Sequence, residues 1–368
     1  MKKSKHISLS ITERCNLNCI YCFEKSKSPQ KMTFETAIEK IDFEVNHSDE
    51  YNSVAVDFMG GEPFLEFNLI KRICEYYWNK QSELAKPLTF FTTTNGTLVH
   101  GEIKEWLEEH SDRFACALSL DGIPLAHNLN RSNSFSRIDV EFFREMWPKQ
   151  KVKSIVSAET LQYLADSVIY MHNLGFPKIE IKLAYGFDWT DSSQCSLFMN
   201  ELDKLKAFYL QHPDLTPCSF LNINIKEVLE PPTYIKKWCQ AGERTISYDM
   251  DGNRYPCRYF QDLRKSGKLS LEDIWKVDYG KIQHELSGSC RTCIIRNLCR
   301  TCYALNFDVN GSFGAKTHMS CRVTQIMAYK TAQLINERDG IGDADMMRAS
   351  QVIIEAFEKH GFQIRGIQ

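Results

Sequence analysis

Three cysteines on one short loop constrain this chain more than any other feature of its sequence. Cys15, Cys19 and Cys22 stand in the run Cys-Asn-Leu-Asn-Cys-Ile-Tyr-Cys, directly after an apolar, strand-like stretch at residues 6–12. Three thiolates on one loop can bind three irons of a [4Fe–4S] cube and leave the fourth iron open to a small molecule, so that the cluster acts as a reagent. A zinc knuckle is the alternative, although structural zinc sites prefer four ligands from paired C-x2-C knuckles.

Strand-like and helix-like segments alternate along the first half of the chain. Apolar, β-rich runs predict strands at residues 6–12, 53–59, 88–94, 114–120, 153–158 and 178–184, with a further possible strand at 220–225. Amphipathic patterns predict helices between them, at residues 33–45, 69–78 and 161–174. Strands that alternate with helices indicate parallel βα units, so the sequence predicts an α/β fold.

Unusual residues follow the first four of these strands. The cysteine loop follows the first, Gly60-Gly61-Glu62-Pro63 the second, Asn95-Gly96-Thr97 the third and Asp121-Gly122 the fourth. A barrel of parallel strands places its chemistry at the carboxyl ends of the strands. The sequence therefore predicts one site to which all four units contribute.

The cysteine spacing resembles the signature of the radical S-adenosylmethionine (SAM) enzymes, and Gly60-Gly61-Glu62-Pro63 resembles their GGEP motif. The resemblance implies a partial (β/α)6 TIM-type barrel over residues 1–230, in which the open iron binds SAM. One electron from the cluster would split SAM to a 5′-deoxyadenosyl radical, which abstracts a hydrogen from the substrate. The residues that it implies for SAM binding are Tyr21, Gly60, Gly61, Glu62, Pro63, Asn95, Ser119 and Arg131; for the last three, a structural role in turns is an equal alternative.

A second group of cysteines lies downstream and resembles the SPASM domain, which binds two further [4Fe–4S] clusters and is expected here at residues 231–325. The resemblance implies that Cys239, Cys257 and Cys302 hold the proximal cluster. It assigns the distal cluster to Cys290, Cys293, Cys299 and Cys321. The turn signal Asp251-Gly252-Asn253 predicts a hairpin that brings Cys239 and Cys257 together. Helices that only pack are expected over residues 326–368.

This second group departs from the SPASM pattern in two ways. The gap between Cys299 and Cys302 is one residue shorter than usual, and only three ligands are evident for the proximal cluster. Cys218 is a possible fourth ligand; otherwise that iron is open to solvent or to the substrate. Two zinc ribbons are the alternative to the whole group. Cys74 and Cys116 match no motif, and their helical and strand patterns predict buried thiols.

One residue bears on the reaction. From about residue 6 to 321 the chain resembles anaerobic sulfatase-maturating enzymes and maturases of ribosomally made peptides, and the former carry an aspartate base directly after the Pro-Cys of the hairpin. Here that position is Arg258, which cannot act as a base but could bind a peptide carboxylate.

We therefore expect a radical SAM peptide maturase that forms a crosslink, such as a thioether or carbon–carbon bond, with its general base unidentified. Formylglycine formation on a sulfatase Cys or Ser is the first alternative. A non-catalytic Fe–S electron-transfer protein or a zinc-ribbon interaction protein is the alternative from another class.

Composition bounds the partners and the location. Lys and Arg number 45 and Asp and Glu 47, with no basic stripe, so nucleic acid is not an expected partner. No signal peptide or membrane-length apolar stretch is present, and fourteen cysteines in such a chain point to metal ligands in a cytoplasmic protein. The expected partners are a peptide or protein substrate and an electron donor of the flavodoxin or ferredoxin type. Because only fourteen residues precede Cys15, a separate leader-binding protein or the catalytic body itself is expected to bind a leader.

Overall fold

Two compact units make up the chain, and each gathers segments that are far apart in the sequence. The first comprises Met1–Ser119, Arg131–Gln150 and Cys239–Lys281, and the second Leu120–Asn130, Lys151–Trp238 and Ile282–Gln368. The computed structural model describes residues 4–22, 24, 27–48, 50–185, 187, 189–231, 239–282, 288–299, 301–317, 321–338 and 342–361. Domain boundaries at residues 230 and 325 stay a prediction.

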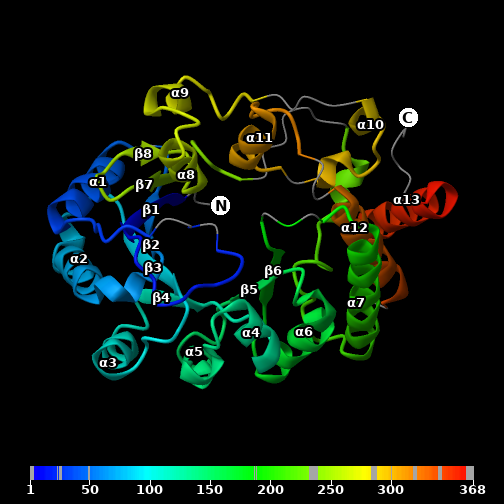
Figure 1. Cartoon of the computed structure of the whole chain (residues 1–368), viewed down its shortest axis with the longest axis horizontal. Coiled ribbons are helices and arrows are strands. Elements are labelled where there is room, and N and C mark those ends of the chain that lie inside the picture. The colour runs from blue at the N-terminus through cyan, green and yellow to red at the C-terminus, as the bar shows by residue number, and fades with distance from the viewer. Residues whose placement is uncertain are drawn as a thin grey trace. The chain divides into compact units, whose positions relative to one another are not determined.

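A six-stranded sheet in the order β4-β3-β2-β1-β7-β8 forms the centre of the first unit (Figure 1). All of its neighbouring strands are parallel except β7 and β8, which form an antiparallel hairpin. The strands are β1 Ser4–Thr12, β2 Ser53–Gly60, β3 Leu88–Thr94, β4 Phe114–Leu118, β7 Thr245–Tyr248 and β8 Arg254–Tyr255. The first four expected strands are confirmed, and the parallel pairing of β7 with β1 was not foreseen.

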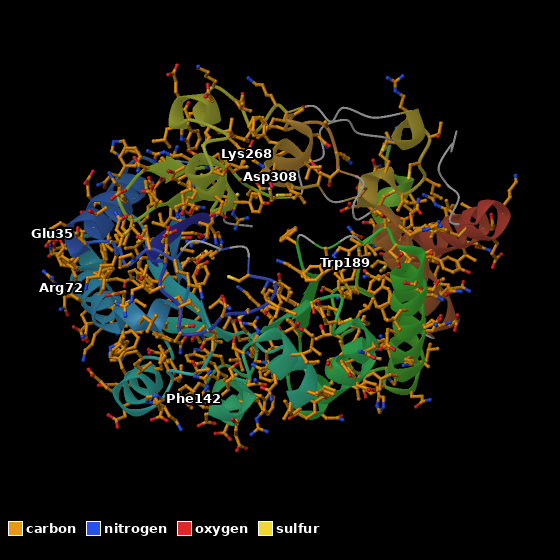
Figure 2. The ribbon with its side chains drawn as sticks, in the orientation of Figure 1. Glu35, Arg72, Phe142, Trp189, Lys268 and Asp308 are labelled. Atoms are coloured by element: carbon orange, nitrogen blue, oxygen red, sulfur yellow. The ribbon has the colours of Figure 1, made fainter. Side chains whose placement is uncertain are left out.

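Helices cover this sheet because their apolar faces need a partner. They are α1 Phe34–Asn46, α2 Phe67–Asn79, α3 Gly101–Glu109, α5 Val140–Met146, α8 Tyr259–Lys265 and α9 Leu271–Trp275, with short 3-10 turns at Pro63–Glu66, Gln81–Glu83 and Phe135–Arg137. The hydroxyl of Thr33 caps α1 by accepting the Thr36 N–H at 3.1 Å. On the outer surface, Arg72 of α2 lies 3.9 Å from Glu35 of α1 (Figure 2).

The second unit holds the fifth and sixth expected strands. β5 Val152–Val156 pairs in parallel with β6 Ile179–Leu183. Its helices are α4 Pro124–Asn130, α6 Leu164–Asn173, α7 Ser192–Gln211, α10 Gly288–Arg291, α11 Tyr303–Asn310, α12 Cys321–Glu337 and α13 Ala344–His360, and its 3-10 turns are Leu161–Tyr163, Ile225–Leu229 and Arg296–Leu298. These strands and helices confirm the predicted α/β class. No helix in the described ranges is both long and apolar enough to cross a bilayer.

The strand expected at residues 220–225 is wrong. The Leu221 N–H donates to the Cys218 carbonyl at 2.9 Å and closes a turn there, and a 3-10 turn begins at Ile225. Phe220 packs edge-to-face on Phe198 of α7, with ring centroids 5.3 Å apart. The apolar side chains are therefore buried against a helix, and the run is apolar without being part of a sheet.

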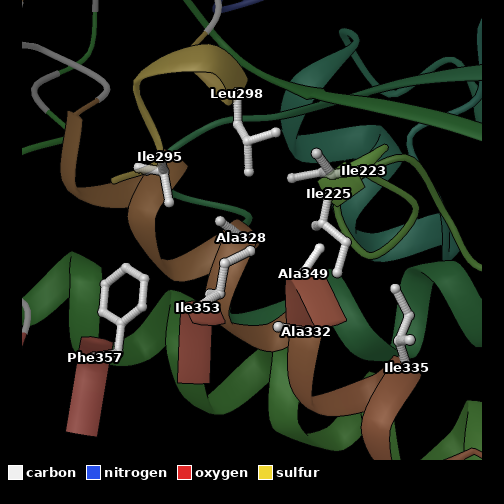
Figure 3. Close-up of a cluster of buried hydrophobic side chains, with 10 residues drawn as sticks. All are labelled: Ile223, Ile225, Ile295, Leu298, Ala328, Ala332, Ile335, Ala349, Ile353 and Phe357. Carbon is white, nitrogen blue, oxygen red and sulfur yellow. The ribbon is translucent and has the colours of Figure 1, made fainter. Parts of the chain in front are cut away.

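The apolar core of the C-terminal part fixes a cysteine-bearing segment (Figure 3). Ile295 and Leu298, which lie between Cys293 and Cys299, are 2% exposed and pack in one cluster with α12 and α13. The cluster consists of Ile223, Ile225, Ile295, Leu298, Ala328, Ala332, Ile335, Ala349, Ile353 and Phe357. The two C-terminal helices thus pack as expected, and they also hold the backbone between two cysteines.

Candidate active site

The cysteine loop follows β1 in the first unit and opens on a pocket. Cys15, Cys19 and Cys22 are half-buried and all three line a pocket of about 790 Å³. The Cys22 N–H donates to the Cys19 carbonyl at 3.1 Å, and the Leu17 N–H to the Cys15 sulfur at 3.4 Å. The loop is therefore a folded turn that presents its three thiols to one space.

Two glycines let the end of β2 lie directly against this loop. The Gly61 N–H donates to the Thr12 carbonyl at 3.2 Å, and the Glu62 N–H to the Arg14 carbonyl at 2.9 Å. A Cβ on Gly61 would lie 2.4 Å from the Arg14 carbonyl oxygen, and one on Gly60 would lie 2.5 Å from that of Thr12. Only glycine allows this approach, and we call residues 60–62 the glycine strap.

Glu62 joins the strap to the end of β3. Its Oε1 accepts the Phe64 N–H at 3.1 Å and the Thr94 hydroxyl at 2.8 Å, and its Oε2 accepts the Asn95 N–H at 2.8 Å. Complete burial raises the pKa of Glu62, although these hydrogen bonds and the positive charge of Arg131 act in the opposite direction. Three of about four acceptor positions of the carboxylate are occupied, so its expected contact with the SAM amino group stays a prediction.

Asn95 connects the end of β3 to the cysteine loop. Its amide nitrogen donates to Asn16 Oδ1 at 2.9 Å, and its own Oδ1 accepts the Thr97 N–H at 3.0 Å. The Asn16 amide in turn donates to the Thr97 hydroxyl at 2.8 Å. Asn95 therefore has the turn role that the sequence left open, and the same side chain positions the loop.

The remaining residues expected to bind SAM also lie in the first unit. The Arg131 guanidinium stands over the Tyr21 ring, 5.3 Å from its centroid. The Ser119 N–H donates to the Thr94 carbonyl at 3.0 Å, and Pro63 begins the turn that follows the strap. The structure thus brings the cysteine loop, the strap and the end of β3 together, while SAM contact by these side chains stays a prediction.

Asp121, from the fourth strand-end motif, belongs to the second unit and has structural partners there. Its Oδ1 accepts the Ile155 N–H of β5 at 2.9 Å, and its Oδ2 accepts the Asn130 amide at 3.2 Å. Gly122 has φ +97°, and a Cβ there would lie 2.0 Å from the Cβ of Ser167. These residues connect α4 to β5, which is a structural use that strand-end position alone did not reveal.

A buried polar network that the sequence did not reveal surrounds Arg258. One guanidinium nitrogen donates to Glu24 Oε1 and the other to the Ser10 hydroxyl. That hydroxyl donates to Gln261 Oε1 at 3.1 Å, and the Gln261 amide donates to the Ser247 hydroxyl at 2.8 Å. The guanidinium, which the sequence allowed to bind a peptide carboxylate, therefore already has a carboxylate partner in this chain. Glu24 and Ser10 carry no local sequence signal for this role.

The donor chemistry of the loop fits an iron–sulfur cluster. Burial raises the pKa of Cys15 and Cys22, while Lys27 beside both thiols and Arg258 beside Cys22 favour the thiolates. No three acidic, histidine or cysteine side chains in the described ranges are arranged to share a single metal ion. A cubane does not require such sharing, because each thiolate binds its own iron.

Four downstream cysteines interact with one another in the second unit. Burial, together with the neighbouring Cys299, Cys321 and Cys290 thiols, raises the pKa of Cys293 to about 11. Burial also raises the pKa of Cys299, with Cys321 and Cys290 adding to the effect and Lys316 opposing it. Four adjacent thiols fit a [4Fe–4S] cluster and equally fit zinc, so the distal assignment stays a prediction.

The proximal cysteines divide between the units. The predicted hairpin exists as β7–β8, with Gly252 at φ +79°, and the Gly242 N–H donates to the Pro256 carbonyl at 3.0 Å. The chain just after Cys239 therefore lies beside the chain just before Cys257. Cys302 precedes α11 in the second unit, and its place in this set stays a prediction.

The other cysteines are buried. Cys218 is 0% exposed and its N–H donates to the Tyr209 hydroxyl at 2.8 Å, which gives no support to a ligand role. Cys74 and Cys116 are 0% and 1% exposed, as predicted. Cys195, which matches no sequence motif, donates from its sulfur to the Trp189 carbonyl at 3.5 Å.

Comparison with known proteins identifies the domain that carries the cysteine loop. Residues 9–138, which carry the cysteine loop and the glycine strap, match the Radical SAM superfamily. Residues 9–138 are a radical SAM domain. The match ends before the downstream cysteines, so the rest of the chain is compared through whole relatives.

Three relatives align over 49% to 80% of the chain. An uncharacterised protein of Methanocaldococcus jannaschii is 30% identical over 185 residues, 49% of this chain and 62% of that protein. The radical SAM cyclopropyl synthase TigE of Paramaledivibacter caminithermalis is 23% identical over 80% of this chain and 66% of TigE. The chain thus spans less than two thirds of both. A cysteine-type anaerobic sulfatase-maturating enzyme of Clostridium perfringens is 23% identical over 78% of this chain and 85% of that enzyme.

Solved radical SAM structures share the fold. Native anSMEcpe with bound AdoMet and the Cp18Cys peptide superposes with a TM-score of 0.71 at 19% identity, over 92% of this chain and 100% of that one. Streptococcus suis SuiB bound to the precursor peptide SuiA gives a TM-score of 0.59 at 14% identity, over 87% of this chain and 76% of that one. At these identities the likeness establishes the α/β fold.

Proposed function

We propose that this radical SAM protein cleaves SAM reductively and uses the resulting radical to crosslink a side chain of a ribosomally made peptide. The observation that carries the proposal is the joining of the cysteine loop to the glycine strap by two backbone hydrogen bonds, beside a pocket lined by Cys15, Cys19 and Cys22. A [4Fe–4S] cluster on these thiols would supply the electron that splits SAM. The chain's own residues hold the loop, and Tyr21 and Arg131 supply a ring and a cation for the ligand.

The electron balance of a crosslink gives the downstream cysteines a role. A thioether or carbon–carbon crosslink removes two hydrogen atoms from the peptide. One leaves as the abstracted hydrogen in 5′-deoxyadenosine, and the other leaves as a proton and an electron, so the reaction needs a one-electron acceptor. Cys290, Cys293, Cys299 and Cys321 would hold such a centre, and Cys239, Cys257 and Cys302 a second, giving three clusters in total.

Formylglycine formation is the second candidate, because the sulfatase-maturating enzyme of Clostridium perfringens aligns over most of this chain. Arg258 argues against it. This residue stands where the resemblance predicts an aspartate base, and its guanidinium is held by Glu24 and Ser10 in the interior. A permanently protonated group cannot take the proton that this reaction releases.

Incubation with two peptides separates these candidates. The reconstituted protein, SAM and dithionite are mixed anaerobically with the Cp18Cys peptide or with a short precursor peptide encoded beside the gene, and the products are weighed by mass spectrometry. We expect loss of two hydrogens from the precursor, no change in Cp18Cys, and no product with Cys15→Ala. Formylglycine on Cp18Cys would establish the second candidate. Failure to release 5′-deoxyadenosine with any peptide would overturn both.

A further inference from the structure

Helix α8 carries a cation at each end, and each cation pairs with a carboxylate that flanks the cysteine loop. Arg258 directly precedes the helix and binds Glu24 through its guanidinium. Lys265 is the last residue of the helix, and its ammonium group pairs with Glu13 Oε1. Glu13 lies two residues before Cys15, and Glu24 lies two residues after Cys22. One helix therefore forms ion pairs with the residues that flank both ends of the loop.

Because each of these ion pairs has at least one buried partner, loss of one partner should destabilise the protein more than loss of a partner from a surface pair. The side chains of Arg258 and Glu24 are 9% and 7% exposed, and that of Glu13 is 5% exposed. Removal of one partner from a buried pair leaves an uncompensated charge in the interior, whereas exposed pairs contribute little. Lys265 is 38% exposed, so its pair is the weaker of the two.

Each pair also reaches a second part of the chain. The other guanidinium nitrogen of Arg258 donates to the Ser10 hydroxyl of β1, the strand that leads into the loop. Glu13 Oε2 accepts the Ser28 N–H at 3.2 Å, beyond the far end of the loop. A planar guanidinium can make two such contacts at once, which a lysine ammonium on a flexible stem does less well.

We propose that Arg258–Glu24 and Lys265–Glu13 form a clamp by which α8 holds the cysteine loop in its cluster-binding geometry. The four residues are positioning residues, and none of them is proposed to touch substrate. Cys257, a predicted ligand of the proximal cluster, directly precedes Arg258. The clamp therefore also connects this cysteine to the cysteine loop through the start of α8. The relation to a cluster rests on the proposed function, but the clamp itself can be tested without metal.

The test measures the reactivity of individual cysteines in the full-length apoprotein. Iodoacetamide labelling, followed by mass spectrometry, gives separate rates for Cys15, Cys19 and Cys22. Cys74 and Cys116 report on global unfolding, because both are buried in the same unit. Arg264→Gln is the matched control, since Arg264 lies on α8 but binds the Tyr255 hydroxyl at 2.6 Å.

The clamp predicts faster labelling of the loop alone. Arg258→Gln should accelerate labelling of the three loop cysteines by about tenfold or more, which corresponds to about 1.4 kcal/mol in the local opening equilibrium. Lys265→Gln should give a smaller acceleration, and Arg264→Gln none. The double variant Glu24→Gln/Arg258→Gln should label its loop cysteines no faster than Arg258→Gln alone, because both charges of the pair are then absent.

Two results would overturn the clamp. One is equal labelling of the loop in Arg258→Gln, Arg264→Gln and the wild type. The other is labelling of Cys74 and Cys116 in step with the loop, which would mean general destabilisation. In the reconstituted protein, Arg258→Gln should also change the electron paramagnetic resonance signal that responds to SAM, and Arg258→Lys should restore only part of it. A wild type without iron at the loop would contradict the proposed function, while the labelling result would still decide the clamp.

Discussion

Replacement of Gly61 by alanine tests how the proposed SAM pocket is built. The added Cβ would lie 2.4 Å from the Arg14 carbonyl oxygen and 2.8 Å from the Cys15 Cβ. Both neighbours belong to the chain that enters the cysteine loop, and backbone atoms cannot rotate away as a flexible side chain can. The strap and the loop must therefore separate by about 1 Å to restore ordinary contact distances.

The cost of this separation can be worked out from the contacts. Relief of the clash strains or breaks the hydrogen bonds from Gly61 N to the Thr12 carbonyl and from Glu62 N to the Arg14 carbonyl, each worth about 0.5–1.5 kcal/mol. Overpacking adds about 1–3 kcal/mol. Together the free energy of unfolding should fall by about 2–6 kcal/mol, and the melting temperature of the first unit by roughly 5–20 °C.

Thermal unfolding of the apoprotein, followed by circular dichroism, measures this loss, and iron analysis after reconstitution measures its effect on the loop. Gly101→Ala is the control, because Gly101 has φ +50° but no atom within 4 Å of an added Cβ. Gly101→Ala should lower the free energy of unfolding by only about 1–2 kcal/mol, through backbone strain, and leave the iron content unchanged. If Gly61→Ala kept wild-type stability and iron content, the close approach of strap and loop would be wrong.

Two further substitutions test the second unit. Burial disfavours ionised Glu180, but the hydrogen bonds and charges of Lys151 and Lys182 outweigh it and lower the pKa of Glu180 from 4.5 to about 2. The stability from these contacts is present above pH 4.5 and is lost as the pH falls through 2. In urea unfolding, Glu180→Gln should lower the free energy of unfolding by about 1–2 kcal/mol at pH 7, after allowance for screening at the half-exposed lysines. The loss should be smaller at pH 3. Ile353→Ala should lower the free energy of unfolding by about 2–5 kcal/mol. It should also lower the iron bound by the distal cysteines without changing the iron bound by the cysteine loop. Equal iron losses at both sites would contradict the separate packing of the distal segment.

Local patterns predicted the local structure well. The six strands of the βα units were found because each is a short apolar run between helical patterns, and the β7–β8 hairpin because Asp251-Gly252-Asn253 needs a turn. The strand predicted at residues 220–225 was wrong, since burial against a helix and burial in a sheet both require apolar side chains. The pairing of β7 with β1 joins residues more than two hundred positions apart, and no local pattern encodes it.

The same limit applies to the site. The thiols of the loop and the glycines of the strap were predicted because their spacing is a local constraint. Arg258 and Glu24 were not paired in advance, since the two are 234 positions apart and no local pattern links them. Glu62 has three hydrogen-bond partners within the chain, because a buried carboxylate must satisfy its acceptors. Its contact with a ligand stays a prediction.

The most direct test of the central claim is SAM cleavage by the first cysteine loop. The anaerobically reconstituted protein should hold about twelve irons, four for each of three clusters, and should release 5′-deoxyadenosine when given SAM and dithionite. Cys15→Ala should retain about eight irons and release none. Zinc in place of iron, or undiminished 5′-deoxyadenosine from Cys15→Ala, would contradict the assignment of Cys15, Cys19 and Cys22 as the SAM-cleaving site.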